Sequence, residues 1–111
     1  MLDDNVFRKH ADAALESLKK SLIAAEDAAA NIEVEDQAGA LHISFEDETR
    51  FVISPNAAAK QIWISALSTS FKLDWSEAHQ DFVLQRTGEN LRPLVARLIN
   101  QQLGGDAVTL K

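Results

Sequence analysis

The sequence contains no cysteine. A chain without thiols has no disulfide framework, no thiolate metal site and no cysteine nucleophile, and such a composition fits a reducing cytoplasm. Glycine is also scarce, with 4 residues in 111, and no glycines are spaced as a phosphate-binding loop. The three histidines, His10, His42 and His79, lie too far apart to form a paired metal-ligand motif. Conventional catalysis therefore has little support.

Long apolar runs are missing as well. No run approaches the ~20 residues that cross a bilayer. The acidic start, Met1-Leu2-Asp3-Asp4, lacks the basic and apolar regions of a signal peptide. We therefore expect a soluble, cytoplasmic protein that does not bind membranes. With 46% hydrophobic and 25% charged residues, the composition suits one globular domain over residues 1–111, expected to be a monomer.

Basic residues are sparse in the first half of the chain, and the net charge is −6. Residues 1–48 hold 12 of the 17 acidic residues but only 4 of the 11 basic ones. An acidic surface repels phosphate backbones, which argues against nucleic acid as a partner, and it favours cations or a basic protein surface. The alternative is that these charges only keep the protein soluble.

Two segments have the apolar spacing of amphipathic helices. The first runs from about Asp3 to Ala29, with a cap at Asp3, Asp4 or Asn5 and a stop near Asn31. Its apolar stripe consists of Phe7, Ala11, Ala14, Leu15, Leu18 and Leu22. The second runs from about Gly88 to Leu103, with Pro93 in its first turn and glycines after it. We expect the tail, residues 107–110, to pack against the core.

Between the predicted helices, six short segments alternate apolar and polar residues with a period of two, which predicts strands. They cover about residues 32–35, 41–46, 50–53, 60–65, 71–75 and 81–85. Tight turns join them, and we expect Ser54-Pro55-Asn56 to break the third strand. Short connections predict an antiparallel meander, and a single apolar parity predicts one buried face. The expected fold is α+β, a two-layer sandwich of six strands with both helices on one face.

The fourth predicted strand, Lys60–Ser65, places a tryptophan on the outer face. Ile62 and Ile64 share the inner face, so Trp63 points outward between Gln61 and Ser65. A large exposed aromatic usually marks a surface that a partner covers. We expect Val52 and Val83 to share this face and give the indole an apolar surround. The alternative is that Trp63 simply lies over long neighbouring side chains.

The acidic residues offer a candidate metal surface. Asp12 and Glu16 lie one helical turn apart, and His42 has the same strand parity as the outward-facing glutamates. The full set is Asp12, Glu16, Glu26, Asp27, Glu33, Glu35 and Asp36. Carboxylates suit hard cations, and an imidazole adds affinity for iron. The alternative is that Arg8–Asp12 and Glu16–Lys20, spaced i,i+4, neutralise much of this charge.

The most specific motif of the chain is Lys60-Gln61-Ile62-Trp63, set in a meander between two helices. It is accompanied by Phe7, Ala11, Asp12, Gly39, Leu41, Ile43, Phe45, Phe71, Asp74-Trp75 and Gly88-x-x-Leu91. In this arrangement the chain resembles the frataxin family, in its bacterial CyaY branch, whose corresponding strand has the pattern (H/K)Q(I/V)W. The chain departs from the family in having no glycine in the loop Ala66–Ser70 and Phe82 where Trp is common. It also has Lys19 and Lys20 where consecutive acidic residues are frequent.

The resemblance implies a regulator or adaptor of iron–sulfur cluster assembly rather than an enzyme. It implies weak binding of ferrous or ferric iron by the acidic set above, and docking to a cysteine desulfurase with its scaffold protein. The residues expected to contact the partner are Asn56, Gln61 and Trp63. Two alternatives from other classes stay open. One is a ferroxidase or iron-storage enzyme, and the other is a protein-binding module without a metal role.

Overall fold

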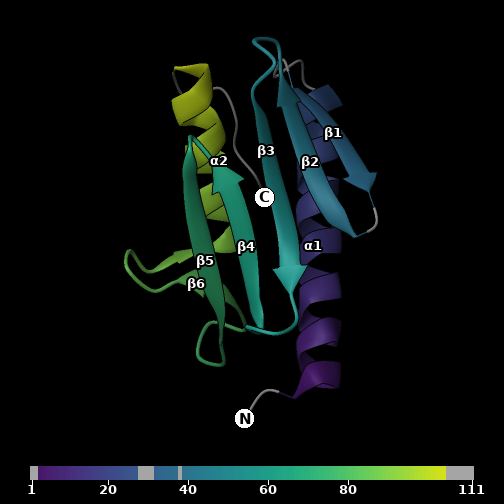
Figure 1. The fold of residues 1–111 in the computed structure, drawn as a ribbon, viewed down its shortest axis with the longest axis vertical. Helices are drawn as coiled ribbons and strands as arrows, with labels where there is room; N and C mark the ends of the chain where they lie inside the picture. Colours follow the sequence, from purple (N-terminus) through teal and green to yellow (C-terminus); the bar gives the residue numbers. More distant parts are fainter. Residues whose placement is uncertain (1–2, 28–31, 38, 105–111) are drawn as a thin grey trace.

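The computed structural model describes residues 3–27, 32–37 and 39–104. Along the chain, a long helix comes first, seven strands follow, and a shorter helix comes last (Figure 1). The elements are α1 (Asp4–Asp27), β1 (Ile32–Gln37), β2 (Ala40–Phe45), β3 (Arg50–Asn56), β4 (Gln61–Ala66), β5 (Thr69–Ser76), β6 (Asp81–Leu84), β7 (Glu89–Asn90) and α2 (Leu91–Leu103). The predicted end of the first helix at Asn31 and the tail at 107–110 lie outside the described residues.

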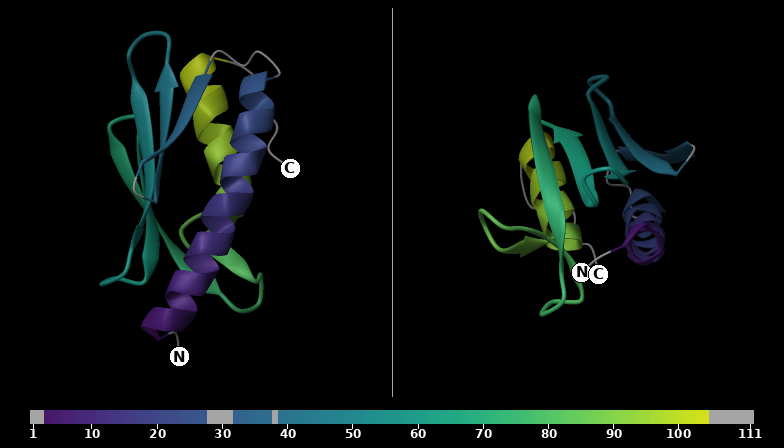
Figure 2. Two further views of the ribbon diagram at one scale, coloured as in Figure 1. Left: turned by 90° about the vertical axis from the view of Figure 1, so that its right-hand side faces the viewer. Right: turned by 60° about the horizontal axis from the view of Figure 1, so that its bottom comes forward.

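The strands form one antiparallel meander in the order β1 to β7. Both helices lie on the same side of this sheet, as the left view of Figure 2 shows. The predicted two-layer α+β sandwich is confirmed, and the Trp63 face carries no helix. Neither α1 nor α2 is long and apolar enough to cross a membrane.

The predicted number of strands was too low by one. Glu89 and Asn90 form the short strand β7, paired with Leu84 and Val83, where the sequence predicted the start of a helix. Gly88 has φ of 79° and donates its N–H to the Leu84 carbonyl at 2.7 Å, which turns the chain back along β6. The helix therefore starts only at Leu91, after Asn90 in an extended conformation.

The buried core confirms the predicted inner face. Ile62 and Ile64 of β4 are 0% and 1% exposed, and the apolar stripes of both helices close over the same face. The rule of one buried parity fails only in β6, where Val83 is also buried although it faces away from the helices.

The start of α1 is capped as the sequence suggested, by Asp3 of the three candidates. Its Oδ1 accepts the Val6 N–H at 2.8 Å, and its carbonyl accepts the Phe7 N–H at 2.8 Å. A carboxylate here also interacts favourably with the positive end of the helix dipole. At the far end of α2, Gly104 adopts φ of 82° and donates its N–H to Asn100.

Pro55 does not break the third strand, contrary to the sequence prediction. It lies one residue before the end of β3, opposite Ile62, a position where a missing N–H is tolerated. The chain reverses over residues 57–60 instead. The Asn56 Oδ1 accepts the Ala59 N–H at 2.9 Å and so closes this turn.

The hairpin between β4 and β5 is tighter than the expected loop over 65–70. Ala66 pairs with Thr69, so only Leu67 and Ser68 form the turn, with φ of 52° and 59°. Asn-Gly or Gly-Gly is usual where both central residues of a hairpin turn need positive φ, because side chains raise the cost of this conformation. Leu67 packs against the core, and this burial offsets part of the strain.

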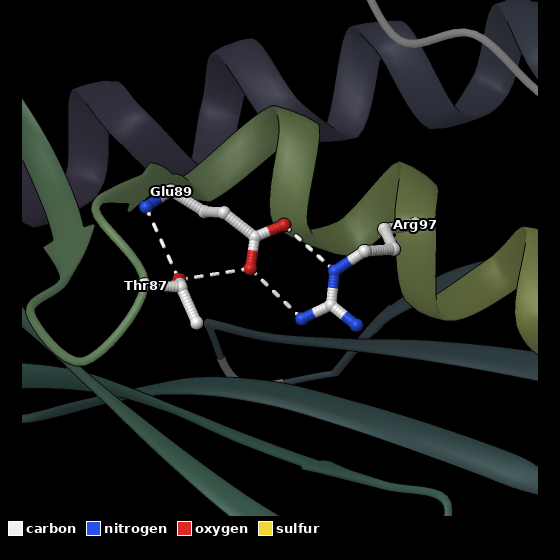
Figure 3. Close-up of polar contacts among 3 residues, drawn as sticks. All are labelled: Thr87, Glu89 and Arg97. Carbon is white, nitrogen blue, oxygen red and sulfur yellow. Dashed lines mark hydrogen bonds and ion pairs between the residues drawn. The ribbon is translucent and has the colours of Figure 1, made fainter.

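Side-chain hydrogen bonds join the β6–β7 turn and β7 to α2 (Figure 3). The Arg97 guanidinium donates two hydrogen bonds to the Glu89 carboxylate, at 2.7 and 2.8 Å, and the Thr87 hydroxyl donates a third at 2.9 Å. Arg97, more than the Thr87 hydroxyl, holds the pKa of Glu89 below its usual value, against the effect of partial burial. The bidentate geometry fixes the position of β7 on the first turns of the helix.

Candidate functional site: the helix-free face and the acidic corner

The helix-free face of the sheet exposes Trp63, one of three large apolar side chains on the surface of the described residues. The other two, Val6 and Ile23, lie on α1. Trp63 is 36% exposed, so the alternation in β4 predicted its side correctly. Its cross-strand neighbours are Ser54 in β3 and Lys72 in β5. The residue directly beside the indole is therefore small on the β3 side and long and charged on the β5 side.

The indole is held in one place by polar contacts. Its Nε1 donates a hydrogen bond to the Gln61 Oε1 at 2.9 Å. The Gln61 Nε2 in turn donates to the Asp74 Oδ1 at 2.9 Å. On the ring face, the Lys72 Nζ lies 4.9 Å from the ring centroid, in cation–π range. The edge of the indole is thus hydrogen-bonded and one ring face lies against the Lys72 ammonium, while more than a third of the surface of Trp63 remains exposed.

Val52 and Val83 share the helix-free face with Trp63, as the sequence predicted, but neither lies directly beside the indole. Val52 lies opposite Ser65, so it is a diagonal neighbour of Trp63, and Val83 lies opposite Asp74, two strands away from the indole. Val83 is also only 6% exposed. The strand register, which parity alone does not define, places a serine and a lysine beside Trp63 instead.

The third predicted partner residue, Asn56, is opposite Gln61 at the end of β3. Asn56, Gln61, Asp74 and Val83 therefore follow one another across four strands. Asn56 uses its side-chain oxygen for the turn to Ala59. The structure thus brings Asn56, Gln61 and Trp63 onto one face, with Asn56 at its edge.

Three of the predicted acidic residues come together where α1 passes β1. Asp12 and Glu16 from the helix and Asp36 from the strand line a cavity of about 190 Å³. Lys19 lines it too, and its Nζ lies 3.3 Å from the Asp36 Oδ2. We call these four residues the acidic corner. A lysine of this chain already compensates part of its negative charge.

The other predicted metal ligands are dispersed. Glu26 accepts the Val34 N–H at 2.7 Å and so satisfies a backbone group of the edge strand β1. Glu35 accepts a hydrogen bond from the Gln37 side chain at 2.8 Å. Glu33 lines a separate cavity of about 360 Å³ with Ser44 and Glu46. Asp27 is the last residue of α1.

His42 lies opposite Glu35, as its parity suggested. Its Nδ1 is buried without a hydrogen-bond partner. Across residues 3–27, 32–37 and 39–104, however, no three His, Asp or Glu side chains lie close enough to hold a metal ion together. The donor set does not fit a closed iron site and presents separate carboxylates instead.

The alternative that ion pairs within α1 neutralise the acidic residues does not agree with the structure. The ion pairs of the described residues are Lys19–Asp36, Lys60–Asp4 and Arg97–Glu89, so neither Arg8–Asp12 nor Glu16–Lys20 is among them. Charge compensation at the acidic corner runs between helix and strand, which spacing along the helix does not reveal.

Sequence reasoning missed Lys72 and Asp74 as parts of the Trp63 site. Both have outward parity on β5, and Asp74 was noted only as part of the matching Asp74-Trp75 pair. The available signal was their polar character on the strand that follows Trp63. Assigning them to the site needed the register of β4 and β5.

Comparison with known proteins identifies the family of the chain. A family model described as a frataxin-like domain matches residues 1–105. The iron–sulfur cluster assembly protein CyaY of Azotobacter vinelandii is 30% identical over 79 residues, which cover 71% of this chain and 72% of that protein. The protein of the same name from Stutzerimonas stutzeri is 29% identical over 83 residues, covering 75% and 74%.

A solved structure shows the same fold. The frataxin of Psychromonas ingrahamii, studied as a model for stability in the CyaY family, superimposes with a TM-score of 0.79 at 18% identity, covering 98% of this chain and 96% of that one. At this identity the likeness concerns the fold alone. The family match over residues 1–105 and the relative at 30% identity show that the chain belongs to the frataxin family, in its bacterial CyaY branch.

Proposed function

We propose that this protein takes part in iron–sulfur cluster assembly as a non-catalytic adaptor. On this proposal it is a cytoplasmic monomer that docks on the cysteine desulfurase and its scaffold protein. The names of its relatives, iron–sulfur cluster assembly proteins, support the pathway. The observation that carries the docking role is Trp63, exposed on a sheet face without a helix and held by neighbouring polar side chains.

The charges on the two surfaces support a protein partner with a defined orientation. Lys72 and Arg50 are exposed on the helix-free face and suit acidic groups of a partner. The acidic corner, at the meeting of α1 and β1, suits basic groups. Opposite charges at separate places favour one docking orientation and speed association at low salt.

Iron enters this proposal as cargo that associates weakly. Exposed and dispersed carboxylates give low affinity, because each contributes few ligands and remains hydrated. Such binding is sensitive to ionic strength. The site residues proposed for it are the three carboxylates of the acidic corner, Asp12, Glu16 and Asp36, together with Glu33 and Glu35 on the outer side of β1.

The direct test is binding of the purified chain to purified cysteine desulfurase, with and without the scaffold protein, in the presence and absence of ferrous ion. The proposal expects saturable binding that ferrous ion changes. Binding that iron leaves unaltered would favour a protein-binding module without a metal role. Iron-dependent oxygen consumption by the chain alone would favour a ferroxidase, and absence of binding under both conditions would contradict the docking role.

Lys19→Gln should raise the affinity for ferrous ion by about two- to fivefold, the scale of one partly exposed ion pair. The substitution removes the ammonium that lies 3.3 Å from Asp36 and leaves the three carboxylates of the acidic corner in place. Anaerobic NMR titration, following the amides of Asp12, Glu16 and Asp36, measures the change.

Lys20→Gln is the matched control, because it removes the same charge from the next, exposed position of α1. It should change the affinity less than Lys19→Gln does. Equal effects of the two variants would mean that only net charge matters. No effect of Lys19→Gln would show that iron does not use the acidic corner.

A further inference from the structure

The orientation of the Trp63 indole depends on the direction of one side-chain amide. A glutamine has an acceptor end and a donor end of nearly the same shape, so Gln61 could present either one to Trp63. The indole Nε1–H only donates. The Gln61 oxygen accepts a hydrogen bond from it, whereas the Gln61 NH₂ group is itself a donor and cannot.

Asp74 settles this choice. Its carboxylate, when ionised, only accepts hydrogen bonds, so it takes the NH₂ end of Gln61. The Gln61 Nε2 lies 2.9 Å from the Asp74 Oδ1, and the Gln61 Oε1 lies 2.9 Å from the Trp63 Nε1. An acceptor-only group at one end and a donor-only group at the other allow one amide orientation.

Strand register makes the arrangement possible. Asp74 lies directly opposite Gln61 in the antiparallel pair β4–β5, and Trp63 follows Gln61 on the same face of β4. Lys72, two residues before Asp74, lies over the ring. Two residues of β5 thus hold the indole. Lys72 lies over its ring face, and Asp74 acts on its edge through Gln61 of β4.

We propose that Asp74 is a positioning residue for docking: acting through Gln61, it holds the Trp63 indole in the orientation that the partner binds. This inference rests on the proposed function. A side chain ordered before association loses less conformational entropy on binding, which strengthens the complex without any new contact.

The same arrangement specifies what the partner offers. The indole N–H is already satisfied inside the protein, so the partner engages the exposed ring by apolar or stacking contact. A partner group that required the Nε1–H would have to break the bond to Gln61. The matching partner surface is an apolar or planar side chain with an acidic group within reach of Lys72.

The test compares Asp74→Ala with Asp74→Asn. Both remove the charge, but asparagine keeps a side-chain oxygen that can accept from Gln61, so their difference isolates the acceptor. In Asp74→Ala, the Trp63 indole N–H resonance should shift and exchange faster with water, and desulfurase–scaffold affinity should fall about fivefold, the scale of one hydrogen bond. In Asp74→Asn, the resonance and the affinity should stay close to those of the wild type.

Gln61→Met gives a second measurement that does not depend on how Asp74 variants fold. It removes both hydrogen bonds from a half-buried position and should produce the same indole signature and loss of affinity. Equal losses for Asp74→Ala and Asp74→Asn would overturn the inference in favour of a charge effect. An unchanged indole resonance in Asp74→Ala would overturn it too.

The two proposals fail in different ways. If Trp63→Ala weakens binding and Asp74→Ala does not, Asp74 has no positioning role and the docking surface stands. If the wild type does not bind the partner, the proposed function fails. The indole resonance then still reports whether Asp74 orients Trp63, because it is measured on the protein alone.

Discussion

Trp63→Ala should weaken binding to the desulfurase–scaffold assembly by about thirtyfold or more, the usual effect of removing a central tryptophan from an interface. The free energy of unfolding should fall by about 1–2 kcal/mol, the scale of one hydrogen bond and one surface cation–π contact, and so by less than the roughly 3–5 kcal/mol lost with a fully buried aromatic. In the free protein the side chain gives up a hydrogen bond to Gln61 and the contact with Lys72. Titration calorimetry and urea unfolding of the same variant measure both quantities.

Ile23→Ala is the matched control for this variant. Ile23 is 39% exposed, close to the 36% of Trp63, but lies on α1 rather than on the helix-free face. Its truncation should leave partner affinity unchanged. If Trp63→Ala instead unfolds readily and its folded fraction binds normally, Trp63 is a structural residue and the docking proposal is wrong.

The side of the sheet that each residue of β4 occupies could be predicted from the sequence. Strand side chains alternate strictly, and one face of this sheet is covered by helices, so the apolar residues identify the inner face. Ile62 and Ile64 are buried, and Trp63 between them is exposed. The same reasoning placed both helices on one face, because all six predicted strands are apolar on one parity only and leave a single face to cover.

Strand boundaries were less predictable, since they depend on turn geometry. The pattern after Gln85 suggests a helix, but Gly88 at positive φ directs the chain back to pair with β6 before α2 begins. Pro55 suggested a break because it lacks an N–H, yet it fits near the end of β3. These outcomes depend on pairing with another strand, which a local pattern does not contain.

The composition of the Trp63 site depended on register. The turn at Leu67–Ser68 lacks the glycine or asparagine that usually marks a two-residue hairpin, so the sequence suggested a longer loop. Without the turn length, the partner of Trp63 on β5 was undefined, and Lys72 and Asp74 were not assigned. The Lys19–Asp36 pair could not be predicted for a related reason, because its members lie 17 positions apart in the sequence and only the packing of α1 on β1 brings them together.

Phe82→Ala should produce the largest loss of stability among these variants, about 3–5 kcal/mol, the range for a fully buried aromatic truncated to alanine. Phe82 is 0% exposed. Its ring contacts Phe7 of α1 edge-to-face, with centroids 5.9 Å apart, and Trp75 of β5 at 5.3 Å. Trp75 also stacks on His10 of α1, at 3.8 Å between ring centroids. This aromatic cluster joins α1 to the last long strands of the sheet.

Phe82→Leu is the control, since it keeps most of the buried apolar volume and should cost much less than the alanine variant. Urea unfolding with an unchanged m-value would show that the native state itself is destabilised.

Under conditions where the Phe82→Ala variant stays folded, its affinity for the desulfurase–scaffold assembly should remain that of the wild type, because Phe82 lies on the inner face of the sheet. A loss of affinity in that folded variant would mean that the inner core and the Trp63 surface are coupled. Retained affinity with low stability is the opposite of the behaviour expected for Trp63→Ala, and the pair of variants separates the residues that hold this fold together from those that it presents to a partner.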